Sequence, residues 1–570
     1  MFTYLDLIVF IGYFVVIVAI GFAAGRGQQL SVDGYFRGNN RLSWYTIGLS
    51  IVAAGVSSEQ FVGEMGYAYK LGMPVANWEW LVFPALSILL WIFVPLYVRH
   101  QITTMPEYLE ERFGPSVRTL YAWLSVASYV FVNFALVFYT GGFALEAMWD
   151  DIDRLTAVWI MAAITGLYTV YGGLPAMAWT SSFQCLLLLG GGLYVFFAGM
   201  AKIGWDFRAV LGNVEGQQAH LMTTADHPEL PWTAFLILAL STNVWYYATN
   251  QYINQRCLAA RNEWHAKMGV LLAGALQVLL PLATCFPGMI YRVINPDLKD
   301  FNAAYPAVVA AVVPVGLRGF VAAAIVGAIM STISGLVNST STIITLDIVQ
   351  RWRGHTWTEE RLVRIGRWSG AVALIIGAAM APVVMRWESI FRYAQDLWAP
   401  MAAPVVVVFL CAALWPSARE RGALACLWLA VLTVPLTLTR AILADADIHF
   451  LPPNLENPMV LAGAISLICW AMMGLLRDRW SPAVGWGLVL AACVPILSIA
   501  VWSPTITALL VATAMLVLVG WPMVRRSRPS AGLWDQSLLR SGAHAPWYTS
   551  VGVWWLVLAA IFAGIYAWFW

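Results

Sequence analysis

The residues best suited to chemistry in this chain are hydroxyl and amide side chains set within apolar segments. The clearest stretch is GFVAAAIVGAIMSTISGLVNSTSTIITLDIVQRW, residues 319–352. Ala328, Ser331 and Thr332 stand at i, i+3 and i+4, so they share one face of a helix. Hydroxyl and carbonyl oxygens are ligands that Na⁺ accepts, but a helix rich in Ser and Thr is also commonly a packing face. This stretch alone leaves both interpretations open.

Two other apolar segments are interrupted by small and polar residues at mid-span. They read LSIVAAGVSSEQFVGEMG, residues 49–66, and LALSTNVWYYATNQYINQR, residues 238–256. Polar groups at that depth are costly unless they pair or face a cavity. A broken helix frees carbonyl groups that can coordinate a cation. One such segment could be explained by hydrogen bonds between helices, whereas two in corresponding halves of the chain indicate a transporter. Carbonyls of Ala53 and Val56 with Ala328, Ser331 and Thr332 form the predicted sodium site.

The elements that position these residues are membrane-spanning helices. Hydrophobic residues make up 61% of the 570 residues and charged residues 11%, against about 25% charged in an average soluble domain. Lipid cannot satisfy an open backbone, which predicts an all-α polytopic membrane protein. Hydropathy windows predict 16 spans: 6–26, 46–69, 78–98, 119–147, 155–173, 177–201, 233–253, 267–291, 318–348, 365–385, 391–415, 422–441, 458–476, 483–502, 505–523 and 550–569.

The distribution of basic residues predicts the orientation of these spans. With the N-terminus outside, 22 of the 32 Lys and Arg residues fall in inside loops and 10 outside. This bias follows the positive-inside rule. It also requires an even number of spans, because the basic cluster at 525–540 must lie inside. We therefore expect a multi-pass protein of the cell membrane.

Several function classes find no support in the sequence. There is no P-loop, HExxH or GxSxG motif, and neither the seven Cys nor the seven His form a metal-ligand spacing. A net charge of +2 gives no electrostatic footprint for nucleic acid, and no obligate protein partner is evident. A carrier or channel, and not an enzyme, is therefore expected.

Span counting predicts an inverted repeat. Each broken segment opens a set of five helices, and because five is odd the two sets enter the membrane from opposite sides. The expected organisation is a leading helix and inside loop at 1–45, a first repeat at 46–204, an outside loop at 205–232, a second repeat at 233–416, and peripheral C-terminal helices at 417–570.

Several runs together resemble the sodium/solute symporter family and its sodium/glucose cotransporter branch. They are AAGVSSEQF, NQYINQRCLAARN, STISGLVNSTSTIITLDI, YGGLPAMAWTSSFQ and YAQDLWAP. The resemblance implies a LeuT-like five-plus-five fold with one preceding helix, and about 14 helices, so 483–502 and 505–523 are a surplus pair. It also implies sodium ligation by the five residues of the predicted site. Where the family usually has Asp in a WTD run, this chain has Ser181, which puts ion stoichiometry in doubt.

The resemblance also assigns a substrate site. Gln60, Glu79, Asn243 and Gln395 match hydrogen-bonding residues of sugar carriers, Tyr246 matches an inner-gate aromatic and Phe391 an outer-gate aromatic. Amides, a carboxylate and aromatic faces suit a polyol. The differing positions are Gly55 in place of Asn, Gln277 in place of Lys, Trp78 and Tyr247 in place of Tyr and Trp, and Glu64 in place of an apolar gate residue. We therefore expect a sugar, sugar derivative or polyol, in a partly rebuilt pocket.

The expected function is sodium-coupled uptake of that small solute by alternating access. Two alternatives remain at this point. The first is a non-transporting sugar sensor. The lack of an attached kinase or receiver domain in this sequence counts against it. The second is a proton-coupled carrier in which Glu64 or Glu79 takes the place of the sodium site.

Overall fold

The fold is described from a computed structural model of the chain. It describes residues 3–26, 31–57, 59–148, 152–212, 219–227, 229–353, 357–384, 390–444, 451–476, 481–524 and 549–569. Apart from one isolated bridge between Leu42 and Ala260, the regular structure in these ranges is helical. This confirms the expected all-α class, in which each segment satisfies its own backbone hydrogen bonds.

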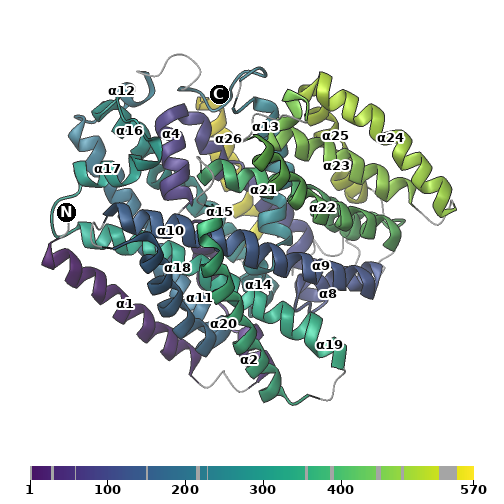
Figure 1. Ribbon diagram of the computed structural model, residues 1–570, viewed down its shortest axis with the longest axis horizontal. Coiled ribbons are helices and arrows are strands. Elements are labelled where there is room, and N and C mark those ends of the chain that lie inside the picture. Colours follow the sequence, from purple (N-terminus) through teal and green to yellow (C-terminus); the bar gives the residue numbers. More distant parts are fainter. Residues whose placement is uncertain are drawn as a thin grey trace.

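Helices of the first half of the chain run in both directions through the molecule (Figure 1). They are α1 (Tyr4–Gly25), α2 (Val32–Arg37), α3 (Trp44–Gly55), η2 (Glu59–Glu64), α4 (Met65–Leu71), η3 (Met73–Ala76), α5 (Asn77–Trp80), α6 (Val82–Ile88), η4 (Leu89–Phe93), α7 (Val94–Arg99), α8 (Met105–Phe113), α9 (Pro115–Ser128), η5 (Tyr129–Asn133), α10 (Phe134–Met148), α11 (Arg154–Lys202) and α12 (Phe207–Gly212), with the short η1 (Gly38–Asn40).

The second half begins with another interrupted segment. Its helices are α13 (Trp232–Ile237), η7 (Leu238–Thr242), η8 (Trp245–Thr249), α14 (Gln251–Leu258), α15 (Glu263–Thr284), α16 (Phe286–Ile294), η9 (Phe301–Ala303), α17 (Ala304–Val312), α18 (Arg318–Thr342), η10 (Ile343–Val349), α19 (Gln350–Arg353), α20 (Glu359–Val384), α21 (Ile390–Leu414), α22 (Glu420–Ala444), η11 (Pro453–Glu456), α23 (Pro458–Leu475), α24 (Pro482–Trp502), α25 (Pro504–Val524) and α26 (Val551–Phe569).

The structure does not confirm the count of 16 spans. Within the described residues, 12 helices are long and apolar enough to cross a membrane. That count takes α11 as one helix, although two helical segments meet within it at a kink where Gly173 adopts φ +60°, between the predicted spans 155–173 and 177–201. A Cβ at Gly173 would lie 2.5 Å from the Tyr35 carbonyl oxygen, so glycine alone fits the bend. The predicted spans 46–69 and 233–253 are broken into shorter helices.

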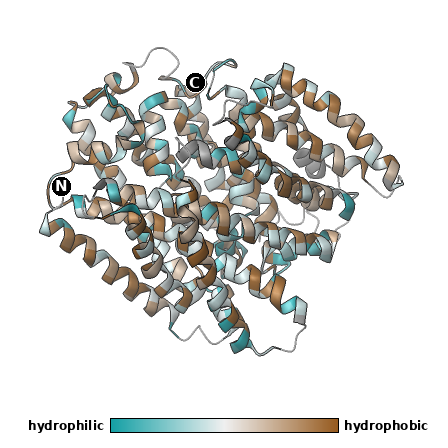
Figure 2. Ribbon diagram, in the orientation of Figure 1, coloured by the Kyte–Doolittle hydropathy of each residue, from teal (hydrophilic) through white to brown (hydrophobic). Residues whose placement is uncertain are grey.

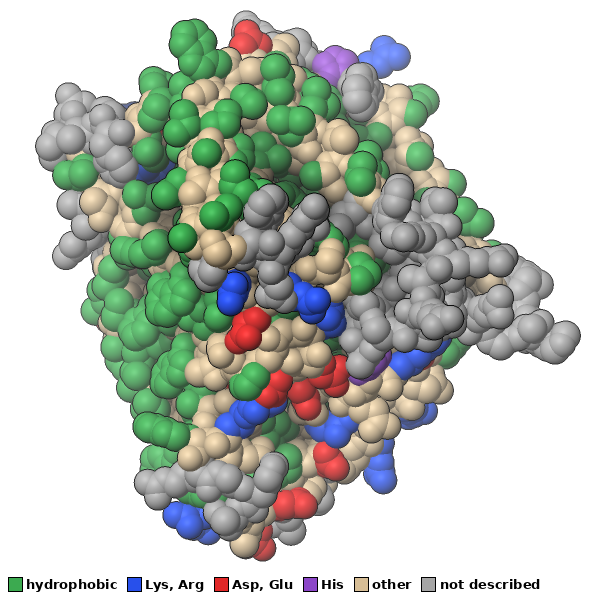
Figure 3. Space-filling view, turned by 90° about the vertical axis from the view of Figure 1, so that its right-hand side faces the viewer, with side chains coloured by type: hydrophobic (Ala, Val, Ile, Leu, Met, Phe, Trp, Pro, Cys, Tyr) green, Lys and Arg blue, Asp and Glu red, His purple; other side chains and the backbone are tan. Residues whose placement is uncertain are grey.

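Burial separates a central helix from peripheral ones. The most apolar window of the α18 span is 94% buried, whereas those of α1 and α26 are 22% and 17% buried. In Figure 1, α1 and the α24–α25 pair lie at opposite edges, and Figure 2 shows α1 and α24 as mostly hydrophobic. Hydrophobic side chains also cover much of the face in Figure 3, with charged ones gathered below. Apolar surface outside and polar hydroxyls inside fit a helix bundle in lipid.

Contacts between helices place the interrupted segments at the centre. α18 packs on α11 and also contacts α3 and α14, while α3 packs on α15 and α11. The broken segment that begins with α3 and the one that ends with α14 therefore both meet α18. This is where the candidate site lies.

Candidate functional site

The first break follows α3, and its side chains replace the missing helical hydrogen bonds. The Ser57 backbone N–H would continue the helix by donating to the Ala53 carbonyl, but it donates to Gln60 Oε1 at 2.8 Å. Gln60 Nε2 in turn donates to the Gly55 carbonyl at 3.1 Å. The Ser57 hydroxyl donates to the Glu59 carboxylate. The Ala53 carbonyl is thus left without its helical partner in a fully buried position.

One hydroxyl of α18, that of Thr332, contacts this break. Thr332 Oγ1 donates to the Ala54 carbonyl at 3.2 Å and lies 3.4 Å from the carbonyl of Ala328. Ser331 Oγ points elsewhere and donates to Ser181 Oγ of α11 at 2.8 Å. The five residues of the predicted sodium site are all buried. The donor set contains only carbonyl and hydroxyl oxygens, which fits a hard cation such as Na⁺.

The second break lies at Asn250, whose backbone is extended at φ −85° and ψ 129°. Tyrosines from neighbouring helices satisfy the groups that it exposes. Tyr97 donates to the Ala248 carbonyl and Tyr121 to the Thr249 carbonyl, both at 3.0 Å. Tyr129 donates to the Asn250 side chain and accepts from the Gln251 N–H at 3.0 Å. Tyrosine hydroxyls thereby pair with the buried polar backbone at this break.

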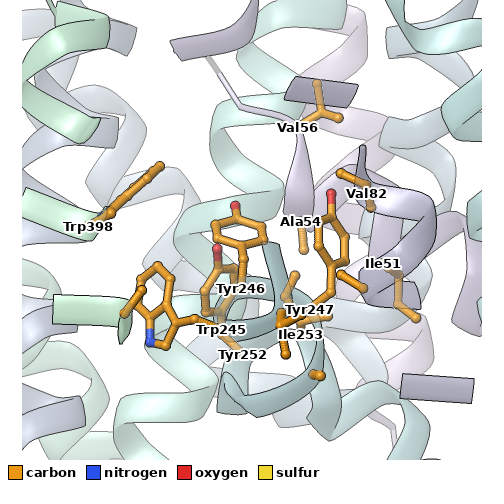
Figure 4. Packing of buried hydrophobic residues seen from close by; sticks show 14 of the residues in the cluster. Ile51, Ala54, Val56, Val82, Trp245, Tyr246, Tyr247, Tyr252, Ile253 and Trp398 are labelled. Carbon is orange, nitrogen blue, oxygen red and sulfur yellow. The ribbon is translucent and has the colours of Figure 1, made fainter. Parts of the chain in front are cut away.

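Two tyrosines before this break form an aromatic wall (Figure 4). The Tyr246 hydroxyl donates to the Gly55 carbonyl at 3.3 Å, and its ring lies 5.9 Å from that of Trp398. A Cβ at position 55 would lie 2.9 Å from the Tyr247 hydroxyl. Gly55, which replaces an Asn of the sugar carriers, therefore leaves the space that Tyr247 occupies.

Two of the predicted substrate and gate residues form a buried carboxyl pair. The side chains of Glu64 and Glu79 are close enough to interact electrostatically, and Gln277 lies beside Glu79. Gln277 Nε2 donates to the Tyr247 hydroxyl at 3.0 Å, and the Cys285 thiol lies 2.8 Å from Glu64 Oε1. All five side chains are buried. The structure thus collects four separate sequence predictions into one polar cluster.

Trp78 and Gln395 line a cavity of about 210 Å³. Glu229 also lines it and receives hydrogen bonds from Tyr67 at 2.6 Å and Lys70 at 2.7 Å. Burial by itself would raise the pKa of Glu229, but these hydrogen bonds lower the pKa below its ordinary value. This carboxylate is therefore already neutralised by Lys70. We name this cavity the vestibule.

The remaining predicted residues are placed as follows. Asn243 lies between η7 and η8 and is buried, and its Nδ2 has no hydrogen-bond partner among the described residues. Gln395 Oε1 is likewise buried and unpartnered there. The side chain of Phe391 lies outside the described residues, so its predicted gate role stays a prediction.

An ion-pair network joins α8, α9, η10 and α19. Arg118 of α9 contacts Asp347 at 2.6 Å and Glu110 at 2.5 Å, and Arg351 contacts Glu110 at 2.5 Å. Burial by itself would raise the pKa of Glu110, but hydrogen bonds from Arg351 and Arg118 lower it below its ordinary value. The network therefore keeps the Glu110 carboxylate charged and ties α8 and α9 to the end of the α18 segment.

Three parts of the site are not predictable from local sequence patterns. Ser181 stands out in the sequence as a missing carboxylate, not as a partner of Ser331. The partners of Cys285 and of the tyrosines at 97, 121 and 129 lie far away in the chain. For the tyrosines, the residue type alone indicates that a buried hydroxyl needs a hydrogen-bond partner, but it does not say which group that partner is. Within the described residues, no group of His, Cys, Asp and Glu could hold a metal ion.

Comparisons with known proteins agree on one family. The sequence profile described as the sodium:solute symporter family matches residues 35–430. The chain is 32% identical over 452 residues to a sodium/glucose cotransporter of Vibrio parahaemolyticus, a match that covers 74% of this chain and 83% of the relative. It is 31% identical over 465 residues to a sodium/myo-inositol cotransporter of Mus musculus, covering 73% of this chain and 64% of that protein.

A solved structure supports the fold. An outward-open, substrate-bound Na⁺-coupled sialic acid symporter superposes with a TM-score of 0.67 at 21% identity, covering 78% of this chain and 98% of that chain. At that identity the likeness concerns the fold, which is the LeuT-like arrangement expected from the sequence.

Proposed function

This chain belongs to the sodium:solute symporter family, and on that premise we propose that it takes up a sugar, sugar derivative or polyol together with Na⁺ by alternating access. The observation that carries the proposal is the contact between the Thr332 hydroxyl of α18 and the break after α3. Thr332 reaches the Ala54 carbonyl there, next to the Ala53 carbonyl, whose helical donor, the Ser57 N–H, bonds to Gln60 instead. A sodium ion held by these oxygens would join two helices that move relative to each other.

Such an ion couples to substrate binding only if it binds one state of the carrier better than the other. An ion that bridges α3 and α18 meets this condition, because movement of either helix separates its ligands. Each Na⁺ moving inward gains about 2.3 kcal/mol per 100 mV. That energy alone supports about a fortyfold accumulation of solute.

The finer organisation belongs to the same proposal. The two interrupted segments open five-helix repeats at 46–204 and 233–416, with the N-terminus outside and the network around Asp347 on the inside. The helices beyond residue 416 are peripheral to this core. The central position of α18, against both interrupted segments, supports this arrangement.

The substrate would bind between the two breaks. Gln60, Glu79, Asn243 and Gln395 supply hydrogen-bonding groups, with Trp78, Gln277 and Tyr247 beside them. Tyr246 closes the inner side through its hydrogen bond to Gly55, and Glu64 and Phe391 would form the outer gate. The glucose and myo-inositol cotransporters among the relatives support a polyhydroxylated solute.

Uptake by purified protein in proteoliposomes tests the proposal. We expect an inward sodium gradient to drive accumulation of labelled solute, and Ser331→Ala with Thr332→Ala to abolish the sodium dependence. Ser339→Ala is the matched control, because its hydroxyl bonds only to the Gly335 carbonyl of the same helix. Sodium dependence that is unchanged in the double variant contradicts the site.

The carboxyl pair favours one second candidate. Glu64 and Glu79 could share a proton, which would make the carrier proton-coupled. Uptake driven by a pH gradient in the absence of Na⁺ would support this alternative, and uptake driven by Na⁺ at equal pH on both sides would reject it.

A further inference from the structure

Within the described residues, the carboxyl pair forms no ion pair with a basic side chain. Glu64 and Glu79 are 0% and 3% exposed. The groups that face them are each other, the Glu59 carboxyl, the Gln277 amide, the Cys285 thiol and the Tyr247 phenol. No Lys or Arg in the described part of the chain forms an ion pair with either carboxyl. Buried carboxylates this close ionise together only beside a positive charge, so the pair requires a proton or a cation.

The hydrogen-bonding groups around the carboxyl pair distinguish between a bound proton and a bound cation. Glu64 Oε2 and Gln277 Oε1 are buried acceptors without a donor among the described residues. The Cys285 thiol is already directed to the other Glu64 oxygen. A proton shared by the carboxyls supplies one donor and leaves the Gln277 oxygen unpaired. An ammonium group supplies three donors and a full positive charge, so it satisfies the whole cluster.

Two other polar groups without hydrogen-bond partners among the described residues indicate the chemistry of the rest of the ligand. Asn243 Nδ2 is a buried donor without an acceptor, and Gln395 Oε1 at the vestibule is a buried acceptor without a donor, both within the described residues. A hydroxyl group can donate and accept, so it suits both. The Trp78 ring, packed edge-on to Phe235 at 6.2 Å, offers an apolar face beside the vestibule. These features fit a carbon frame that carries several hydroxyls.

We propose that the substrate is a polyhydroxylated amine taken up as its ammonium form, with the nitrogen held by Glu64 and Glu79. This rests on the proposed symport function and names its substrate class. The amine site is separate from the sodium site, which is formed by neutral oxygens of α3 and α18. Uptake would therefore move the charge of the substrate in addition to that of Na⁺.

Matched pairs of probes test the charge requirement. Glucamine and glucosamine are compared with sorbitol and glucose by thermal-shift titration of the purified full chain in sodium chloride, at a pH where both amines are protonated. We expect each amine to bind at least about tenfold more tightly than its hydroxyl analogue, because the analogue leaves two buried carboxyls without a counter-charge. Equal or tighter binding of the neutral probes overturns the proposal.

Three variants locate the effect. Glu64→Gln and Glu79→Gln should each reduce the preference for the amine, and Gln277→Lys should reverse it by placing an ammonium group beside the pair. Glu146→Gln is the control, because that carboxylate pairs with Arg154 away from the cluster and should leave the preference unchanged. Stabilisation by sodium checks that each variant is folded. An amine preference that persists in Gln277→Lys contradicts the proposal, even if the two Glu variants fail to fold.

The same titrations separate this inference from the proposed function. Sodium-dependent binding of neutral sugars only would overturn the amine requirement and leave sodium symport standing. Amine binding that does not depend on Na⁺ would support the amine site and contradict sodium coupling.

Discussion

Ser181 shows how a single exchanged residue is connected to the predicted ion site. The sequence shows that Ser181 stands where the family usually has Asp. Only the folded chain shows that the Ser181 hydroxyl contacts the Ser331 hydroxyl at 2.8 Å. Both residues are fully buried. The hydroxyl therefore keeps the hydrogen bond that a carboxylate could make there, without the negative charge.

Restoring the carboxylate should strengthen cation binding. In Ser181→Asp we expect the apparent sodium affinity to rise about tenfold, because a bound cation offsets the cost of a buried carboxylate next to Ser331, and that cost is uncompensated when the ion is absent. Sodium titration of thermal stability measures this change, with Ser181→Asn as the uncharged control. An equal effect of Asn and Asp would show that charge at this position does not reach the ion.

Residue spacing predicts the face of α18 but not its partners. Ser331 and Thr332 follow from helical periodicity alone. Their contacts with Ser181 and Ala54 join segments 150 and 278 residues apart, and no local pattern encodes such distances. In the sequence, Glu64 and Glu79 are likewise two separate positions, one a departure from the family pattern and one a match. Only the folded structure shows that the two carboxyls lie together beside Gln277, with no Lys or Arg paired to them among the described residues.

At the scale of elements, the two breaks were predictable because they interrupt apolar spans with small and polar residues. The groups that stabilise the second break were not. They are tyrosines on α7, α9 and η5, whose hydroxyls pair with residues 248–251. The kink in α11 falls at Gly173, where the predicted span 155–173 ends and shortly before the predicted span 177–201 begins.

Removing two of these hydroxyls should destabilise the protein. In Tyr97→Phe with Tyr121→Phe, the carbonyls of Ala248 and Thr249 lose their donors in a buried site, at a cost of about 1–3 kcal/mol for each. The loss is read as a lower unfolding temperature in detergent. Tyr4→Phe is the control, because Tyr4 is exposed on α1. An unchanged unfolding temperature in the double variant would show that other groups satisfy the break.

At the scale of the whole molecule, α18 forms a central axis with apolar helices around it. Composition alone predicts this division into a polar centre and a lipid-facing rim. It does not predict the number of spans, because each of the broken segments 46–69 and 233–253 reads as one apolar span although it consists of shorter helices. The orientation rests on the positive-inside bias and is open to direct test.

Single cysteines should report opposite sides of the membrane. Asp297→Cys, in the loop between α16 and α17, should react with an impermeant maleimide on intact cells, whereas Glu360→Cys on α20 should react only after permeabilisation. The native cysteines provide a low background, since six of the seven are buried. The reverse labelling pattern would invert the proposed topology.

The central claim is that Na⁺ binds where α18 meets the break after α3. Equilibrium binding of radioactive sodium to the purified protein tests it most directly, because no substrate needs to be known. We expect saturable binding by the unmodified chain and by Ser339→Ala, and loss of that binding in the Ser331→Ala, Thr332→Ala double variant. Saturable binding that is unchanged in a folded double variant would contradict the account.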